Sequence, residues 1–278
     1  MATRKMFQVD AFADALFKGN PAAVLVVETG LPVNLMQTIA QENNLAETAF
    51  VTRAEAGWHI RWFTPVHEAG FCGHATLAAA HVLCTEYGVD LPIRFATRSV
   101  GELQVSRAAG GMYSLDLPRL DPLALEPVPP LLAGLFPDSW IEVCRNFENL
   151  FVTLPTADAV RSYQPDLRAI SRLHPLGLVI TAAGGETHDG TPVDFTSRYF
   201  APGAGIDEDP VTGSIHATLV PYWANRLEKT EMLAFQASAR GGTLVCKLLP
   251  GRVVLTGAAI TFLRAEVILG ALDHPVSQ

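Results

Sequence analysis

The chain has few cysteines and few charged residues, and both shortages exclude classes of protein. Its four cysteines form no CxxC pair, which argues against a disulfide framework and against a structural zinc site. Only 17% of the 278 residues are charged and the formal net charge is -8. No cluster of Lys and Arg supplies the electrostatic footprint that nucleic acid or anionic lipid requires. We therefore expect no nucleic-acid partner and no membrane partner, and a small molecule is the expected ligand.

Long apolar runs and several catalytic motifs are also absent from the sequence. No window reaches the roughly 18 uninterrupted apolar residues of a membrane-spanning helix, and residues 1–10 do not resemble a secretory signal, so we expect a cytoplasmic protein. The sequence contains no GxxxxGK[ST] phosphate loop, no HExxH and no GxSxG. Residues 203–205 lack the third glycine and the strand-to-helix context of a dinucleotide fingerprint. We expect no metal and no cofactor.

Apolar residues are plentiful, and their spacing predicts a mixture of strands and helices. They make up 49% of the chain, enough to bury a core. Alternating patterns at 7–12, 58–63 and 113–117 are typical of half-buried strands. Helices are predicted at 32–44, which opens with a proline, and at 74–87 and 214–227, which are nearly all apolar and should lie inside the core.

Two segments of the chain resemble each other and indicate an internal duplication. FTP at 63–65 precedes CGHATL at 72–77, and FAP at 200–202 precedes TGSIHATL at 212–219. Between the copies, residues 118–137 are rich in proline, which cannot sit in central strands. We predict one domain at 1–120 and a second at 121–278, leaving open whether the last strand returns to the first domain.

Each copy carries a glycine at the mouth of an apolar helix, Gly73 in the first and Gly213 in the second. The unpaired N–H groups and the positive end of the helix dipole can receive an anionic group, and a glycine lets the ligand approach closely. The alternative is that both glycines only permit tight turns. Finding two such junctions in a repeated context favours a ligand site.

Carboxylate, imidazole and thiol groups lie near these junctions. Glu47 stands between the first helix and an apolar strand, where partial desolvation raises the pKa of a carboxyl group towards the range useful for proton transfer; the alternative is a surface glutamate. Asp209 precedes the second turn with Asp207 and Glu208, and we expect two of these three to cap the helix. His74 could donate a hydrogen bond to a substrate or serve only the structure.

Cys72 lies beside the first glycine, and a helix N-terminus is expected to lower the pKa of such a thiol. In the second copy Thr212 occupies the matching position. A two-base racemase needs an acid/base group on each face of the carbon, and a hydroxyl is far too weak an acid to pair with a thiolate. A two-thiol racemase is therefore disfavoured. His216, one turn into the last helix, is expected to be a core residue.

These residues resemble the PhzF-like phenazine-biosynthesis family, whose fold is shared with diaminopimelate epimerase. The matching segments lie at 7–12, 19–24, 44–50, 63–77 and 200–214. The resemblance implies an α+β fold of two similar domains, each a β-barrel-like sheet around a central apolar helix, with a cleft between the domains and commonly a homodimer. It implies no cofactor.

The resemblance also implies roles for individual residues. Glu47 would move the proton, assisted by His74 and Asp209, and the substrate would bind at positions within the matched segments, namely Asn20, Cys72, Gly73, Gly213 and Ser214. The expected activity is that of a cofactor-independent isomerase that shifts a proton on a small carboxylate-bearing metabolite, resembling dihydro-hydroxyanthranilate isomerase. Two alternatives stay open: an amino-acid-type racemase or epimerase using Cys72, and a non-catalytic protein that binds an acidic metabolite.

Overall fold

The computed structural model describes residues 3–136 and 140–269. Contacts divide the chain into two compact units, one made of Met1–Asp116 with Thr256–Gln278 and the other of Leu117–Leu255. The division falls close to the proline-rich segment in which a boundary was predicted, and strand β18 (Ala259–Ile268) belongs to the first unit with the N-terminal strands. Among the described residues, no helix is both long and apolar enough to cross a membrane.

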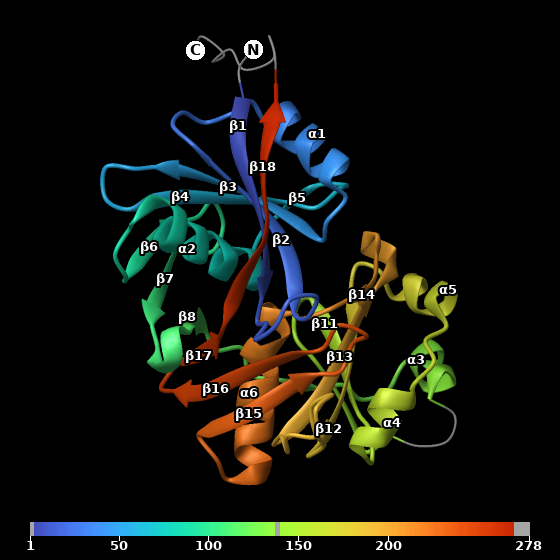
Figure 1. The fold of residues 1–278 in the computed structure, drawn as a ribbon. Helices are drawn as coiled ribbons and strands as arrows, with labels where there is room; N and C mark the ends of the chain where they lie inside the picture. The colour runs from blue at the N-terminus through green and yellow to red at the C-terminus, as the bar shows by residue number, and fades with distance from the viewer. Residues whose placement is uncertain (1–2, 137–139, 270–278) are drawn as a thin grey trace. The chain divides into compact units, whose positions relative to one another are not determined.

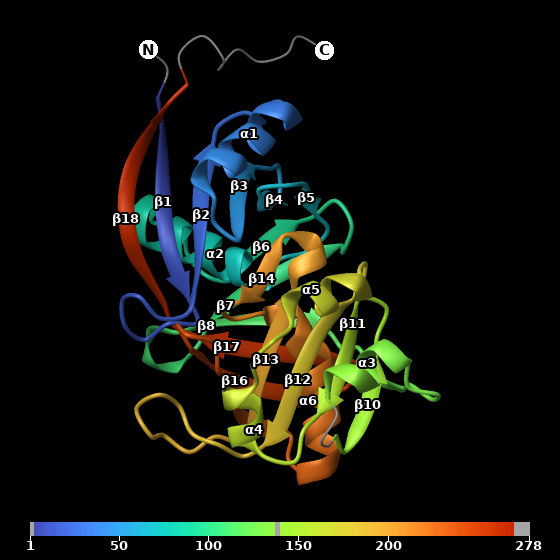
Figure 2. The ribbon, with the colours of Figure 1, turned by 90° about the vertical axis from the view of Figure 1, so that its right-hand side faces the viewer.

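The first unit is a mixed sheet with helix α2 packed against it (Figure 1). Its elements are β1 (Thr3–Ala11), β2 (Asn20–Val27), α1 (Val33–Asn43), β3 (Glu47–Arg53), β4 (Trp58–Phe63), β5 (Glu68–Ala69), α2 (Gly73–Tyr87), β6 (Ile93–Ala96), β7 (Glu102–Arg107), β8 (Tyr113–Pro118) and β18. Strand β1 pairs antiparallel with β18 on one side and with β2 on the other, as Figures 1 and 2 show. The sheet continues with β2–β3 parallel, β3–β4 antiparallel, β4–β6 parallel and β6–β7 antiparallel.

The second unit repeats this order of pairings. Its elements are β9 (Leu123–Ala124), α3 (Pro130–Leu135), β10 (Glu142–Arg145), β11 (Asn149–Thr153), α4 (Ala157–Ser162), α5 (Leu167–Ile170), β12 (Gly177–Ala183), β13 (Phe195–Ala201), β14 (Ile206–Asp209), α6 (Gly213–Leu227), β15 (Glu231–Gln236) and β16 (Gly242–Leu249), with β17 (Arg252–Gly257) at the boundary. From β10 to β16 the pairings run antiparallel, parallel, antiparallel, parallel, antiparallel. The closure of either sheet into a barrel stays a prediction.

Each parallel pairing requires a crossover connection, and helices supply it at matching places in the two units. Helix α2 joins β4 to β6, and α6 joins β13 to β15. Both are 15 residues long and largely buried, as expected for helices that are apolar on most sides. The predicted helices agree with α1, α2 and α6 to within one residue at each end.

Candidate functional site

In the first unit the sheet and helix α2 bring the predicted residues together. Asn20 and Glu47 are the first residues of β2 and β3, and neighbouring parallel strands begin at the same edge of a sheet. Helix α2 packs against β1, β2 and β3, so its first turn delivers His74 to this edge. Cys72 immediately precedes the helix as its N-cap residue.

The His74 ring lies at the centre of this group. Its Nε2 is 3.1 Å from Glu47 Oε2, and its Nδ1 is 3.2 Å from the Asn20 amide nitrogen and 3.4 Å from Cys72 Sγ. All four side chains are buried, Glu47 the least of them at 9% exposure. Four of the residues predicted for the site therefore form one buried cluster, with Gly73 between Cys72 and His74 in the chain.

The contact between Glu47 and His74 meets the distance of an ion pair but not the geometry of a hydrogen bond. Glu47 Oε2 is buried and has no hydrogen-bond partner among the described residues. A hydrogen bond weakens steeply when it is misaligned, so this contact is electrostatic. The oxygen thus lies beside a positively polarised ring without being committed to it.

The pKa of the Cys72 thiol is raised to about 11, first by burial and second by the negative charge of Glu47. The expectation that the helix N-terminus would lower this pKa is wrong, because desolvation and a neighbouring carboxylate outweigh the helix end. Cys72 is therefore a protonated thiol at neutral pH.

Burial disfavours the charged form of His74, but the negative groups of Cys72 and Glu47 raise its pKa well above 6.5. Cys72 is the larger of the two raising influences and Glu47 the second.

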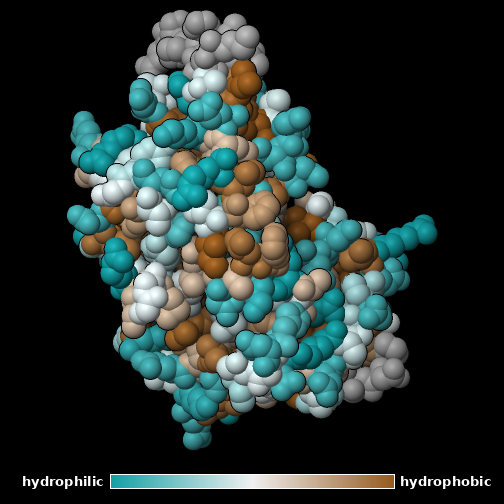
Figure 3. All heavy atoms as spheres, in the orientation of Figure 1, coloured by the Kyte–Doolittle hydropathy of each residue, from teal (hydrophilic) through white to brown (hydrophobic). Residues whose placement is uncertain are grey.

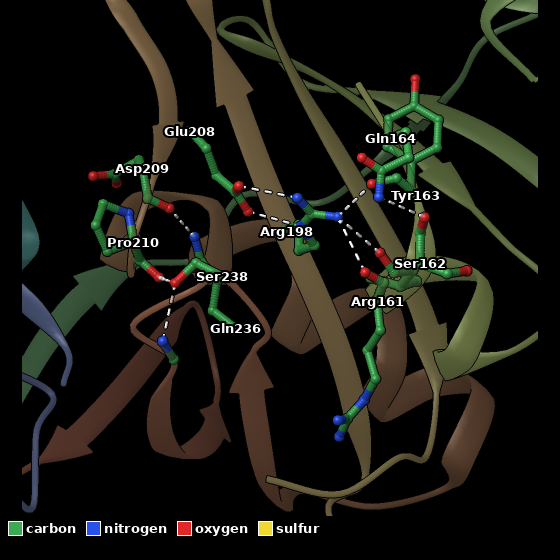
Figure 4. A network of polar contacts seen from close by, with 12 residues as sticks. Arg161, Ser162, Tyr163, Gln164, Arg198, Glu208, Asp209, Pro210, Gln236 and Ser238 are labelled. Atoms are coloured by element: carbon green, nitrogen blue, oxygen red, sulfur yellow. Dashed lines mark hydrogen bonds and ion pairs between the residues drawn. The ribbon is translucent and has the colours of Figure 1, made fainter. Parts of the chain in front are cut away.

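In the second unit the turn before α6 is held by one glutamine. Gln236 Nε2 donates to the backbone oxygen of Asp209 over 2.8 Å, and Gln236 Oε1 accepts from the backbone N–H of Thr212 over 2.8 Å. The Thr212 hydroxyl donates to Asp209 Oδ2. Figure 4 shows Asp209 and Gln236 joined in this way. The sequence offered no signal for Gln236, which reaches the turn only because β15 pairs with β13.

The acidic residues before α6 do not cap it. Asp207, Glu208 and Asp209 belong to strand β14, and α6 has no side-chain cap, so the expectation that two of them cap the helix is wrong. Glu208 instead forms a two-pronged ion pair with Arg198, at 2.7 and 3.0 Å. Arg198 Nη1 also donates to the backbone oxygen of Tyr163 over 2.7 Å, at the end of α4 (Figure 4).

The two long crossover helices share one feature at their N-termini. Neither α2 nor α6 has a side-chain cap or an acidic residue in its first turn, whereas the short helices α4 and α5 are capped by Thr156 and Asp166. First-turn N–H groups have no partner within a helix. The turns at Gly73 and at Gly213 with Ser214 are therefore suited to an anionic group such as a carboxylate.

Comparison with known proteins identifies the chain. The model of the family described as Phenazine biosynthesis-like protein matches residues 9–265. An uncharacterized isomerase of Pseudomonas aeruginosa is 46% identical over 258 residues, which cover 91% of this chain and 94% of that protein. The crystal structure of a PhzF-family phenazine biosynthesis protein from Enterococcus faecalis aligns with a TM-score of 0.88 and 41% identity, over 96% of this chain and all of that one. The protein is an isomerase, and it belongs to the PhzF-like phenazine-biosynthesis family, as its motifs predicted.

More distant likeness concerns the fold alone. A hydroxyproline epimerase from Agrobacterium vitis aligns with a TM-score of 0.59 over 99% of this chain and 94% of that one, at 11% identity. The fold, a mixed sheet with helices, is thus shared with epimerases outside the family. This agrees with the predicted relationship to diaminopimelate epimerase-like folds.

Proposed function

We propose that the protein is a cofactor-independent isomerase that shifts a proton on a small carboxylate-bearing metabolite, resembling dihydro-hydroxyanthranilate isomerase. The observation that carries the proposal is the buried Glu47 carboxylate, whose Oε2 has no hydrogen-bond partner in the described chain although it lies 3.1 Å from His74 Nε2. A general base must hold an uncommitted lone pair in a site from which water is largely excluded.

In this proposal Glu47 takes a proton from a carbon of the substrate, and the electrons delocalise towards the substrate carboxylate. The same carboxyl group then returns the proton to another carbon, so that no atom is gained or lost. First-turn N–H groups at Gly73 bind the carboxylate, and Asn20 and Cys72 line the same cluster. Preorganised N–H donors that stabilise developing negative charge are among the largest contributions to catalysis.

His74 and Asp209 assist the transfer. The negative groups of Cys72 and Glu47 raise the pKa of His74 above its usual 6.5, so Nε2–H can stabilise the negative charge of the intermediate or supply a proton. Gly213 and Ser214 of the second turn also bind the substrate, and Asp209 is oriented by Thr212 and Gln236.

The test is the substitution Glu47→Gln, which keeps the shape of the side chain but cannot accept a proton. Turnover of dihydro-hydroxyanthranilate, or of the most reactive acid in a panel of small unsaturated carboxylates, should fall by roughly two to four orders of magnitude. Proton movement is followed by NMR as solvent deuterium enters the substrate. The control is Glu42→Gln, the same change on the exposed face of α1. Unchanged turnover in Glu47→Gln would remove Glu47 as the base.

An epimerase using Cys72 is the second candidate, favoured only by the 3.4 Å contact between Sγ and His74 Nδ1. A protonated thiol can give a proton but cannot take one, and Thr212 cannot replace the missing partner. Deuterium that enters a stereocentre without migration of a double bond, with inactivation by iodoacetamide, would support the epimerase over the isomerase.

We also propose that the protein assembles as a homodimer through strand β18. Large apolar side chains are exposed along it and beside it, including Phe262 at 44%, Ile268 at 68% and Phe17 at 65%. Phe17 packs edge-on against Phe262 at 5.7 Å, and Figure 3 shows hydrophobic side chains gathered over this strand. Exposed apolar surface of this kind is typical of an interface. Light scattering should report a dimer for the natural protein and a monomer for Phe262→Asp.

A further inference from the structure

Three side chains of the first unit hold one oxygen, one sulfur and one nitrogen close together. Glu47, Cys72 and His74 each offer a ligand atom, and these atoms all lie within 4.8 Å of one another. The separations involving His74 Nε2 are 3.1 Å to the carboxylate oxygen and 3.9 Å to the sulfur. All three residues are buried, and no other such group is found in the part of the chain that the structure describes.

A zinc ion bound by these three atoms would set the distances between them. Bonds of about 2.0–2.1 Å to nitrogen and oxygen and about 2.3 Å to sulfur place neighbouring ligands roughly 3.2–3.6 Å apart. The 3.1 Å and 3.9 Å separations lie within a few tenths of an ångström of that range, and the carboxylate-to-sulfur distance is at most 4.8 Å. Cys72 Sγ lies nearer to Nδ1, at 3.4 Å, so the Cys72 side chain rotates towards Nε2 when the three atoms share an ion. Three protein ligands with a fourth position open is the arrangement of zinc sites that exchange ligands. A thiolate and an imidazole favour Zn²⁺ over the hard cations Mg²⁺ and Ca²⁺.

We propose that Glu47, Cys72 and His74 bind Zn²⁺ and that the bound ion inhibits the isomerase by occupying its base. Bonds form from Glu47 Oε2, Cys72 Sγ and His74 Nε2 to the ion, and a water molecule takes the fourth position. The thiol proton leaves to solvent, as does one imidazole proton when the ring is charged. No electron is transferred. The inhibition rests on the proposed function, whereas the binding does not.

Charge balance explains why a buried triad beside a helix N-terminus can accept a cation. The positive end of α2 disfavours a free cation, but the thiolate and the carboxylate together carry two negative charges and neutralise Zn²⁺. The complex with a neutral imidazole and water then carries no net charge. A buried site with no net charge avoids the large desolvation cost of an unpaired ion.

Asn20 contacts the His74 ring nitrogen that does not bind the ion. A histidine that ligates through Nε2 carries its proton on Nδ1 and donates it to a neighbouring oxygen. The Asn20 amide lies 3.2 Å from Nδ1, and a half-turn of its carboxamide exchanges the nitrogen for the oxygen. The same residue can therefore orient His74 for proton transfer or for metal binding.

The experiment titrates the full chain with ZnCl₂ by calorimetry and, separately, with Co²⁺ under absorption spectroscopy. We expect one Zn²⁺ per chain and a near-ultraviolet thiolate-to-cobalt band. Cys72→Ser should abolish the band, and Glu47→Gln should weaken Zn²⁺ binding by about tenfold or more. Cys84→Ser, on the same helix but outside the cluster, should change neither. A band that survives Cys72→Ser, or no Zn²⁺ binding at micromolar concentrations, overturns the site.

Turnover in the presence of Zn²⁺ separates this inference from the proposed function. Turnover should fall over the same Zn²⁺ range that saturates the calorimetric site, and chelation with EDTA should restore it. Full turnover with Zn²⁺ bound overturns the inhibition. If Glu47→Gln turns out fully active, the proposed function fails, while the calorimetric and spectroscopic results still decide the metal site.

Discussion

His216 should make the free energy of unfolding depend on pH in the weakly acidic range. The ring is fully buried in α6, and Nδ1 donates to the backbone oxygen of Thr212 over 2.8 Å. Nε2 has no hydrogen-bond partner among the described residues. Burial lowers the pKa of His216 from 6.5 to about 4, although the hydrogen bond to Thr212 opposes the shift.

The free energy of unfolding falls as the pH falls wherever the unfolded chain binds more protons than the folded chain. Above the unfolded pKa of 6.5 the ring is neutral in both states, so it contributes no pH dependence. As the pH falls from 6.5 to about 4, His216 binds a proton in the unfolded chain but not in the folded chain, so the free energy of unfolding decreases. The full shift corresponds to about 3 kcal/mol, of which about 2 kcal/mol is lost between about pH 7 and about pH 5.

The perturbation is His216→Asn, which keeps a donor near the Thr212 oxygen but cannot titrate. Urea unfolding of the natural protein and the variant, at about pH 7 and about pH 5, gives the loss of stability for each. The variant should lose about 2 kcal/mol less than the natural protein over this interval. The comparison uses the change with pH, so any constant cost of the substitution cancels. His59→Asn, on an exposed ring of β4, is the control. Equal losses in the natural protein and His216→Asn would refute the reasoning.

Three further substitutions test the second unit. Gln236→Leu should lower the free energy of unfolding by about 1–3 kcal/mol, because it leaves buried backbone groups of the turn without partners, and it should also slow turnover more than it changes KM. Glu208→Gln should cost about 3 kcal/mol, because Arg198, 9% exposed, keeps its charge and loses its partner. Gly177→Ala should cost about 1–3 kcal/mol, because the added Cβ would lie 2.4 Å from the Tyr199 ring.

Matched controls separate these effects from the substitutions themselves. Gln164→Leu changes an exposed glutamine, and Glu102→Gln breaks an exposed pair with Arg94 at 3.8 Å; both should change stability by less than about 1 kcal/mol. Gly134→Ala lies in helix α3 with nothing within 4 Å of its Cβ and should be neutral or stabilising. If a control costs as much as its counterpart, the contact assigned to that counterpart is not the cause.

Local signals in the sequence were enough to place the long helices and to single out residues that lie together in the candidate site. Pro32 before α1 and Gly88 after α2 mark helix boundaries through their own backbone preferences, and Gly88 adopts a left-handed conformation with φ 66°. Glu47 and His74 were found because they lie in recognisable segments beside apolar elements. Their side chains lie 3.1 Å apart, and their roles in a site stay a prediction.

The predictions that were wrong concern properties that depend on residues far away in the sequence. The pKa of Cys72 is set by burial and by Glu47, which lies 25 positions earlier in the chain, and not by the helix that follows it. Glu208 is bound to Arg198 on the adjacent strand β13 instead of to α6. Gln236 holds a turn 24 positions earlier. Contacts of this kind follow from strand pairing, which a single sequence does not specify.

The unequal chemistry of the two duplicated turns bears on the mechanism. Both precede helices of 15 residues and both N-caps are extended, so the backbone offers the same anion-binding geometry twice. The first turn adds the imidazole of His74 and the thiol of Cys72. The second turn has Ser214 and Thr212 at the matching positions, and the Thr212 hydroxyl donates its hydrogen bond to Asp209. A two-base racemase needs acid/base groups of similar strength on both faces of a carbon, and hydroxyl groups cannot match a thiol or an imidazole. The asymmetry therefore favours one base that both removes and returns the proton, and under the proposed function that base is Glu47.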